Sequence, residues 1–182
     1  MHPVLRAMSA AAAATVMLGA ADPAPVNEAG QARIEAAPCE HLPEHRQFDF
    51  WIGEWDVLGP EGRKVGGNSI RKMPGGCVLL ESWSSVAGAP GASINYYDPS
   101  RRKWVQIWVD ARASVLRIEG ELRDGAMRLA GEHVARDGGR ERFRGAWTPL
   151  PDGRVRQYLE QSKDGGRSWY VWFDGLYNRR AE

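Results

Sequence analysis

The stretch that decides the fold is Phe48-Asp49-Phe50-Trp51-Ile52-Gly53-Glu54-Trp55-Asp56-Val57, the densest aromatic cluster in the chain. Its aromatic and branched side chains bury a large apolar area when they pack, at about 25 cal/mol per Å². Gly53 lies where a tight turn gives way to a strand, and glycine tolerates the backbone angles of such a junction. We therefore expect this segment to plug one end of an antiparallel β-barrel and to begin its first strand.

The chain after Trp55 has the pattern of short strands joined by tight turns. Apolar and polar residues alternate, and Gly, Pro, Asp and Asn occupy the breaks. No long helical periodicity interrupts this pattern, and consecutive hairpins favour an up-and-down barrel because closure removes exposed sheet edges. The fold class expected is an all-β barrel of about ten strands. The predicted strands span residues 55–58, 68–73, 77–86, 93–97, 104–110, 115–122, 127–134, 141–148, 155–162 and 169–177.

The segment before the aromatic cluster has the features of an export leader. Arg6 precedes a short apolar run that ends at Leu18, and small residues follow up to Ala21. The run is shorter than the roughly 20 residues that a membrane anchor needs. We expect cleavage near Ala21 and a periplasmic or secreted protein. The expected parts are residues 1–21, a signal peptide; 22–40, a flexible lead-in; and 41–182, a single β-barrel domain.

The charge of the mature chain is balanced. Removal of the leader takes away Arg6 and no acid, so the 24 basic residues become 23, against 23 acidic residues. A net charge of zero argues against nucleic acid, which binds a basic face. The sequence contains no second long apolar run, so we expect no stable insertion into a membrane. The expected partner is a small molecule, and the sequence leaves the oligomeric state open.

Cys39 and Cys77 are the only cysteines. In an exported protein two cysteines favour one disulfide, and two buried free thiols are the alternative. His41 and His45 lie close to Cys39, and His-x-x-x-His places two rings on one face of a helix. The segment is short and contains Pro43, so we expect no metal site there.

Gly53-Glu54-Trp55 is the G-x-W signature of the calycins, the group of lipocalins and fatty-acid-binding proteins. In that group the Trp packs across the closed end of the barrel beneath an Arg from the end of the last strand. The resemblance therefore implies structural roles for Gly53 and Trp55, with Arg179 or Arg180 over the indole ring.

More of the chain resembles an uncharacterised bacterial family of secreted calycin-like proteins, and this resemblance implies the fold without an activity. The entry-strand segment is also similar to that of nitrobindin-like haem barrels, which need a His ligand late in the chain. Here the last His is His133, so we expect no haem cofactor. The matching segments are Phe48–Val57, Leu80–Trp83, Ser93–Asp98, Trp104–Asp110, Arg144–Pro149, Val155–Gln157 and Phe173–Tyr177.

Alternate residues of a strand face opposite sides, so one set of side chains lines the lumen. We favour the face with several Trp and amide side chains, because Trp is costly to expose. Aromatic walls with a few polar groups are typical of a small-molecule pocket. The alternative places Val105, Ile107 and Val109 inside as a filled core. The candidate ligand-binding residues are Glu81, Trp83, Ser93, Asn95, Gln106, Trp108, Arg144 and Gln157.

Two of these candidates have competing interpretations. Arg144 fits an outer face with cross-strand ion pairs, or a pocket for a carboxylate. Glu81 in an apolar lumen is a weak candidate for a catalytic base with a raised pKa. The sequence has no G-x-S-x-G motif, phosphate loop or serine evidently paired with histidine. The expected function is therefore a carrier or sensor of a small apolar or aromatic ligand, with a small isomerase or hydrolase, or a filled-core interaction domain, as alternatives.

Ser162-Lys163-Asp164-Gly165-Gly166-Arg167-Ser168-Trp169 fits the Asp-box pattern that recurs in sialidase propellers. One copy cannot build a propeller. We interpret it as a hairpin in which Asp and Ser side chains bond the amides of the turn.

Overall fold

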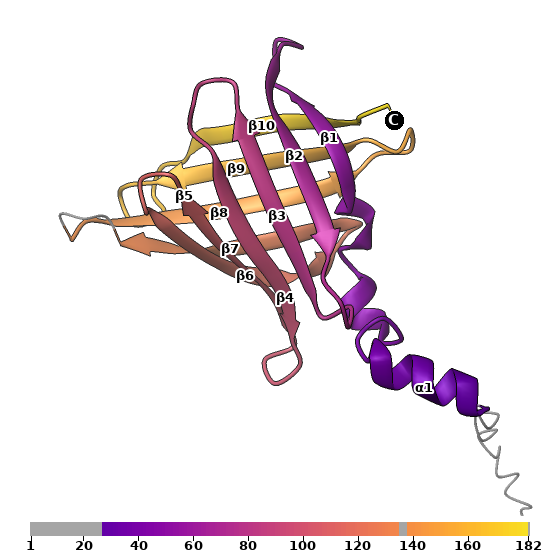
Figure 1. Cartoon of the computed structure of the whole chain (residues 1–182). Helices are drawn as coiled ribbons and strands as arrows, with labels where there is room; N and C mark the ends of the chain where they lie inside the picture. The colour runs from indigo at the N-terminus through magenta and orange to yellow at the C-terminus, as the bar shows by residue number, and fades with distance from the viewer. Residues whose placement is uncertain (1–26, 135–137, 182) are drawn as a thin grey trace, which may run out of the picture.

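The computed structural model describes residues 27–134 and 138–181. Ten antiparallel strands form one closed barrel in which each strand pairs with its neighbours in the chain and β1 closes the ring against β10 (Figure 1). The prediction of an all-β, up-and-down barrel is confirmed. The strands are β1 (Gly53–Leu58), β2 (Lys64–Lys72), β3 (Val78–Ser85), β4 (Gly91–Asp98), β5 (Lys103–Asp110), β6 (Val115–Arg123), β7 (Ala126–Val134), β8 (Arg140–Pro149), β9 (Val155–Ser162) and β10 (Tyr170–Arg179).

Strand β2 begins at Lys64, earlier than the sequence pattern predicts. The part of β2 that the sequence pattern does not predict contains Gly66 and Gly67, and glycine lowers the strand propensity of the segment in which it lies. Both positions need a residue without a side chain. A Cβ atom on Gly66 would overlap the ring of Trp83, and one on Gly67 would lie 2.7 Å from the guanidinium of Arg180.

The lead-in contains a helix that the sequence analysis does not predict. Helix α1 spans Glu28–Ala36 and projects away from the barrel (Figure 1). The backbone N–H of Gly30 donates to Oδ1 of Asn27 at 2.8 Å, which caps the first turn. Ala, Glu, Gln and Arg in this stretch are all good helix formers, so local propensity accounts for the helix. The predicted signal peptide lies outside the described residues, and no helix within them is long and apolar enough to cross a membrane.

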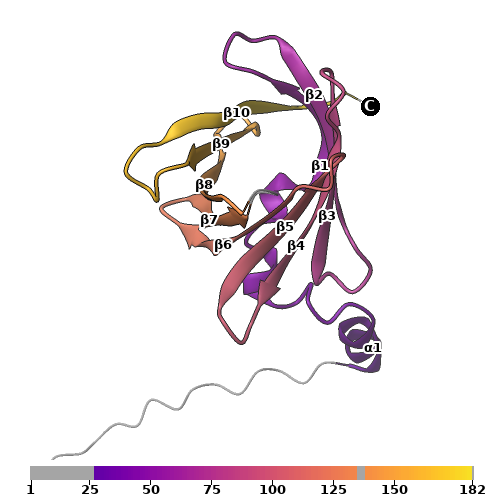
Figure 2. The same cartoon turned by 90° about the vertical axis from the view of Figure 1, so that its left-hand side faces the viewer.

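The aromatic cluster closes one end of the barrel. Two short 3₁₀ helices, η1 (Pro43–Arg46) just before the cluster and η2 (Asp49–Trp51) within it, lie behind the ring of strands when one looks along the barrel (Figure 2). Phe48 and Trp51 are completely buried, and their rings stack with centroids 4.9 Å apart. The rings of Trp104 and Trp147 meet Phe48 edge-on from the barrel wall. This end of the lumen is therefore filled by aromatic side chains.

Trp55 lies at the closed end beneath an arginine. The guanidinium of Arg179 lies 4.4 Å from the centre of the Trp55 ring and donates to the carbonyl of Ile52 at 3.2 Å. Trp55 Nε1 donates to the carbonyl of Trp51 at 2.9 Å. Arg180 points outside and pairs with Asp56. These contacts join the last strand, the first strand and the plug.

Cys39 and Cys77 form a disulfide, as the sequence predicts. The bond ties the segment before η1 to the turn between β2 and β3, and the N–H of Cys39 also donates to the carbonyl of Gly75 at 3.1 Å. The plug is thereby held at the closed end from its N-terminal side. Within residues 27–134 and 138–181 no group of three or more His, Cys, Asp or Glu side chains is placed to hold a metal ion.

The Asp-box segment is the turn between β9 and β10. Asp164 accepts hydrogen bonds from the hydroxyls of Ser168 and Ser162 and from the backbone N–H groups of Arg167 and Ser168. These bonds, led by that of the Ser168 hydroxyl, hold the pKa of Asp164 well below its usual range. Trp169 Nε1 donates to the carbonyl of Gly166 at 3.1 Å. The segment is a hydrogen-bonded turn.

Candidate functional site

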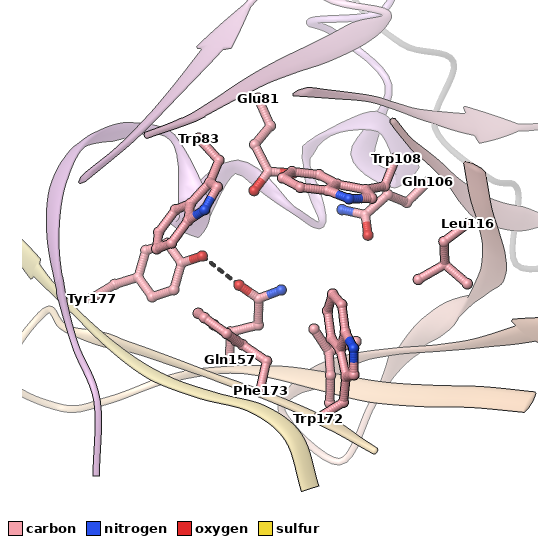
Figure 3. Close-up of a pocket in the computed structure, with 10 residues that line it drawn as sticks. Glu81, Trp83, Gln106, Trp108, Leu116, Gln157, Trp172, Phe173 and Tyr177 are labelled. Atoms are coloured by element: carbon pink, nitrogen blue, oxygen red, sulfur yellow. Dashed lines mark hydrogen bonds between the residues drawn. The ribbon is translucent and has the colours of Figure 1, made fainter. Parts of the chain in front are cut away.

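A cavity lies at the open end of the barrel, opposite the aromatic plug. Its volume is about 70 Å³, and side chains of β3, β5, β6, β9 and β10 line it (Figure 3). A wider vestibule of about 460 Å³ lies outside it, bordered by the β1–β2 and β3–β4 turns and by β10. Four aromatic side chains line both spaces, and we call them the aromatic collar: Trp83, Trp108, Trp172 and Phe173.

The lumen is lined by the face of β5 that carries Trp and Gln. Gln106 is only 4% exposed and lines the cavity together with Trp108, whereas Val109 on the opposite face is 41% exposed. Val105 is buried but belongs to neither the cavity wall nor the main core cluster. The filled-core alternative, with Val105, Ile107 and Val109 inside, is therefore not the arrangement observed.

The structure brings most of the candidate ligand-binding residues together. Ser93 and Asn95 are buried in the wall behind the cavity. Arg144 points outside, where its Nε donates to Glu160 at 2.7 Å and its guanidinium lies 4.1 Å from the centre of the Trp169 ring. The five candidates that line the cavity are Glu81, Trp83, Gln106, Trp108 and Gln157.

Five further cavity residues are absent from the sequence-based set: Leu116, Leu159, Trp172, Phe173 and Tyr177. Tyr177 and Phe173 share the inward face of β10, and strand alternation alone is enough to identify them. Trp172 is the neighbour of Phe173, so on a regular strand its side chain would face outward. A bulge between Val171 and Phe173 shifts the pairing with β9, and this shift lets both Trp172 and Phe173 reach the cavity.

A buried hydrogen-bond network surrounds Glu81, the one carboxyl group of the cavity wall. Asn68 Nδ2 donates to its Oε1 at 2.7 Å, and the Ser93 hydroxyl donates to its Oε2 at 2.5 Å. Asn68 also donates to the Tyr177 hydroxyl at 3.1 Å, and that hydroxyl donates to Oε1 of Gln157. The network thus crosses the lumen from β3 through β2 and β10 to β9.

The same network continues along the other wall. Asn95 Nδ2 donates to the Ser93 hydroxyl at 2.9 Å, and Gln106 Nε2 donates to Asn95 Oδ1 at 2.8 Å. Ser93 and Asn95 therefore fix the orientations of Glu81 and Gln106. The amide nitrogen of Gln157 and the amide oxygen of Gln106 have no hydrogen-bond partner among the described residues, and both side chains face the cavity (Figure 3).

Burial changes the ionisation of two groups in this network. Burial raises the pKa of Glu81 from 4.5 to about 7, while hydrogen bonds from Ser93 and Asn68 act in the opposite direction. Burial, followed by the nearby Glu81, raises the pKa of Tyr177 well above its usual value. Tyr177 therefore stays neutral, whereas Glu81 changes its charge near neutral pH.

Two collar tryptophans lie flat on glycines of neighbouring strands. A Cβ atom on Gly66 would overlap the ring of Trp83, and one on Gly91 would overlap the ring of Trp108. The absent side chains let both rings lie against the wall instead of filling the lumen. The cavity thus depends on these glycines as much as on the residues that line it.

A second polar cluster lies near the open end, and the sequence analysis missed it. The Ser114 hydroxyl lies 3.1 Å from Nε2 of His133, and Nδ1 of His133 lies 3.4 Å from Oε2 of Glu141. This order of groups is that of a nucleophile, a base and an acid. However, Nδ1 of His133 makes no hydrogen bond with a described residue. The Glu141 oxygen nearest to it already accepts a hydrogen bond from Nε2 of Gln161. The backbone N–H of Ser114 likewise already donates to Oδ1 of Asp110. We interpret the cluster as a contact between the β5–β6 turn, β7, β8 and β9.

No protein-family model matches the chain, and no curated protein sequence matches it. The candidate site is therefore interpreted from its own geometry and chemistry.

Proposed function

We propose that this protein is an exported, calycin-like barrel that binds a small apolar or aromatic molecule at the open end of its lumen. The observation that carries the proposal is the cavity behind the aromatic collar, whose wall contains a buried carboxyl and two amide groups that each keep one atom without a partner among the described residues. Aromatic walls with a few oriented polar groups are typical of small-molecule sites. The plug leaves the open end as the side from which a ligand reaches this cavity.

The dimensions of the site support a small ligand. The inner cavity of about 70 Å³ holds only a small group. The vestibule of about 460 Å³ falls within the roughly 300–1,000 Å³ typical of ligand pockets. We propose that a ring lies in the collar and that a small polar group reaches the buried network. A long lipid chain does not fit within the inner cavity.

The proposed membership of a secreted calycin-like family and the proposed location have separate support. The Gly53-Glu54-Trp55 segment, with Arg179 over Trp55, matches the arrangement that the resemblance to calycins implies. The disulfide suits a periplasmic or secreted protein. We propose that neither haem nor a metal ion takes part, and that no nucleic acid is bound.

The first test is native mass spectrometry of the protein purified without refolding, beside a denatured sample. A reproducible additional mass that denaturation releases is expected if the cavity retains its ligand. If the purified protein carries no bound molecule, it is titrated with 2-phenylethanol, a neutral single-ring probe. Tryptophan fluorescence then reports binding. No bound mass together with no response to the probe would contradict the proposal.

Trp83→Ala and Gln106→Ala are each expected to weaken binding of 2-phenylethanol by about 10-fold while the barrel stays folded. The first removes one wall of the collar, and the second removes a polar group oriented by Asn95. Isothermal titration calorimetry measures the affinity, and circular dichroism checks the fold. Trp169→Ala is the matched control because Trp169 lies outside the barrel against Arg144. Equal losses in the control and in the lumen variants would count against a lumenal site.

Gly91→Ala is expected to push the ring of Trp108 into the lumen and to lower the affinity for the same probe by about 10-fold. The added methyl group would overlap the ring, which has open space on the side of the cavity and the vestibule. Ala92→Ser, which adds one atom on the exposed face of the same strand, is the control. An affinity and a near-UV circular dichroism spectrum that match wild type would show that the glycine does not shape the cavity.

A further inference from the structure

The charged groups that border the cavity and the vestibule are all acidic. Glu81 lines the cavity, and Asp110 and Asp174 line the vestibule. No Lys, Arg or His side chain of the described chain lines either space. The whole chain has 24 basic and 23 acidic residues, so the acidic lining differs from the overall balance.

The two vestibule acids differ in how far they are already neutralised. Asp174 is paired with Arg156 at 2.8 Å on the outer wall. Asp110 accepts the backbone N–H groups of Arg112 and Ser114 in the β5–β6 turn and makes no ion pair with a described residue. Asp110 is therefore the carboxylate of the vestibule wall that has no ion pair with a described residue, and a cation fits beside it better than an anion.

Glu81 is a buried carboxyl without a cationic partner. It is 3% exposed, and its described hydrogen-bond partners, Asn68 and Ser93, are both uncharged. A buried charge is costly unless it is paired. An ionised carboxylate accepts about four hydrogen bonds, and Glu81 receives one on each oxygen, so acceptor capacity remains. The carboxylate points between the rings of Trp83 and Trp108 into the cavity (Figure 3).

The remaining groups around Glu81 also suit a cation. The free amide oxygen of Gln106 lies on the same side of the cavity and adds a second acceptor (Figure 3). The aromatic collar offers ring faces, which attract organic cations. Tyr177, the other titratable group in the cavity, stays neutral.

From these observations we infer that the lumen selects a small organic cation, a protonated amine that carries an aromatic or short alkyl group. The ammonium lies against the Glu81 carboxylate and the Gln106 carbonyl, and the apolar part lies in the aromatic collar. The inference rests on the proposed function, since it names the class of molecule that the lumenal site takes. A carboxylate ligand is disfavoured because like charges repel in a poorly solvated site.

The test compares two probes that share a ring and a chain and differ in charge, 2-phenylethylamine and 2-phenylethanol. Isothermal titration calorimetry is performed on the whole protein at about pH 8, above the pKa of about 7 of Glu81. The amine is expected to bind about 10- to 100-fold more tightly than the alcohol, the range for a hydrogen bond to a charged group. Equal affinities, or a preference for the alcohol, would overturn the inference.

Glu81→Gln keeps the shape of the side chain and removes its charge. It is expected to abolish the preference for the amine over the alcohol. Glu121→Gln, which removes a charge from an exposed residue of the outer wall, is the matched control and should retain the full preference. A preference for the amine that survives in Glu81→Gln would show that Glu81 does not recognise the cation.

A pH series on the wild-type protein gives a readout that needs no variant. The groups that face Glu81 are Asn68 from β2, Ser93 from β4, Gln106 from β5, Gln157 from β9 and Tyr177 from β10, and none of them is charged near neutral pH. Affinity for the amine should therefore fall as the pH decreases below about 7, by up to about 10-fold per pH unit, while that for the alcohol stays constant. A flat profile for the amine would contradict the inference.

The two probes distinguish failure of the cation inference from failure of the proposed lumenal function. If the alcohol binds in the lumen and the amine gains nothing, the lumen binds neutral ligands and only the choice of a cation is wrong. If neither probe binds, the lumenal function itself is contradicted and the inference is overturned with it.

Discussion

Replacing Cys39 and Cys77 together by serine is expected to lower the free energy of unfolding by about 4 kcal/mol. The disulfide closes a chain segment with a sequence separation of 38, and loss of this restraint increases the entropy of the unfolded chain. The bond also holds the plug segment against the β2–β3 turn, so its loss weakens the closed end of the barrel. Urea unfolding of the oxidised protein and of the double variant, followed by tryptophan fluorescence, measures the difference.

Reduction of the wild-type protein without mutation is the control for the serine side chains. The reduced protein and the double variant should unfold at the same urea concentration, below that of the oxidised protein. A difference smaller than about 1 kcal/mol would mean that the plug is held by its aromatic contacts alone, such as that of Phe48 with Trp51.

The second large expected effect is a pH-dependent stabilisation in Glu81→Gln. The pKa of Glu81 is about 7 in the folded protein and has a reference value of 4.5, so the folded state holds the proton between these values and the unfolded state does not. The wild-type protein therefore loses stability as the pH rises from about 4.5 to about 7. The pKa difference corresponds to about 3 kcal/mol. Glutamine does not titrate, so the variant should be more stable than wild type by about this amount above pH 7.

The measurement is the free energy of unfolding in urea from about pH 4 to pH 8 for both proteins. Their difference should be small at the acidic end, where Glu81 is neutral, and should approach its maximum near pH 8. Glu121→Gln, at an exposed position, should run parallel to wild type throughout. If Glu81→Gln also runs parallel to wild type, the carboxyl is not buried as the structure places it.

The amine-binding and stability experiments are linked through the same residue. A variant that is more stable and yet loses its preference for the amine is expected when a group is kept for binding at a cost in stability. Glu81 fits this pattern because its charged form is unfavourable in the empty barrel and has no partner until a cation arrives. A gain in stability together with an unchanged preference for the amine would separate the two roles.

The sequence predicts the strands well because their pattern is local. Alternation of apolar and polar residues, together with Gly, Pro and Asp at the turns, identifies all ten strands. The exceptions also have local causes. Gly66 and Gly67 hide the beginning of β2, and the helix-forming composition after Asn27 produces α1 where no regular structure is expected.

The site is predicted only in part because a cavity depends on contacts between distant strands. Glu81, Trp83 and Gln106 are found by strand alternation, since they lie on regular strands with one clear inward face. Trp172 is missed because a bulge changes the inward face of β10. Arg144 alternates along β8 with the buried Phe143 and Trp147, so strand alternation already favours the outer face, and the pairing with Glu160 agrees with it.

By itself the sequence determined the all-β class and a count of about ten strands, and it favoured a disulfide and the Trp-bearing face of β5 as the lumen, which the structure then confirmed. These properties follow from residue types, from a period of two and from the count of cysteines. The tertiary structure alone decided that the lumen is filled at one end and open at the other, that Glu81 is buried without a cation, and that glycines make room for two tryptophans. The physical reason is that volume, burial and charge balance are sums over side chains that the barrel brings together from strands far apart in the chain.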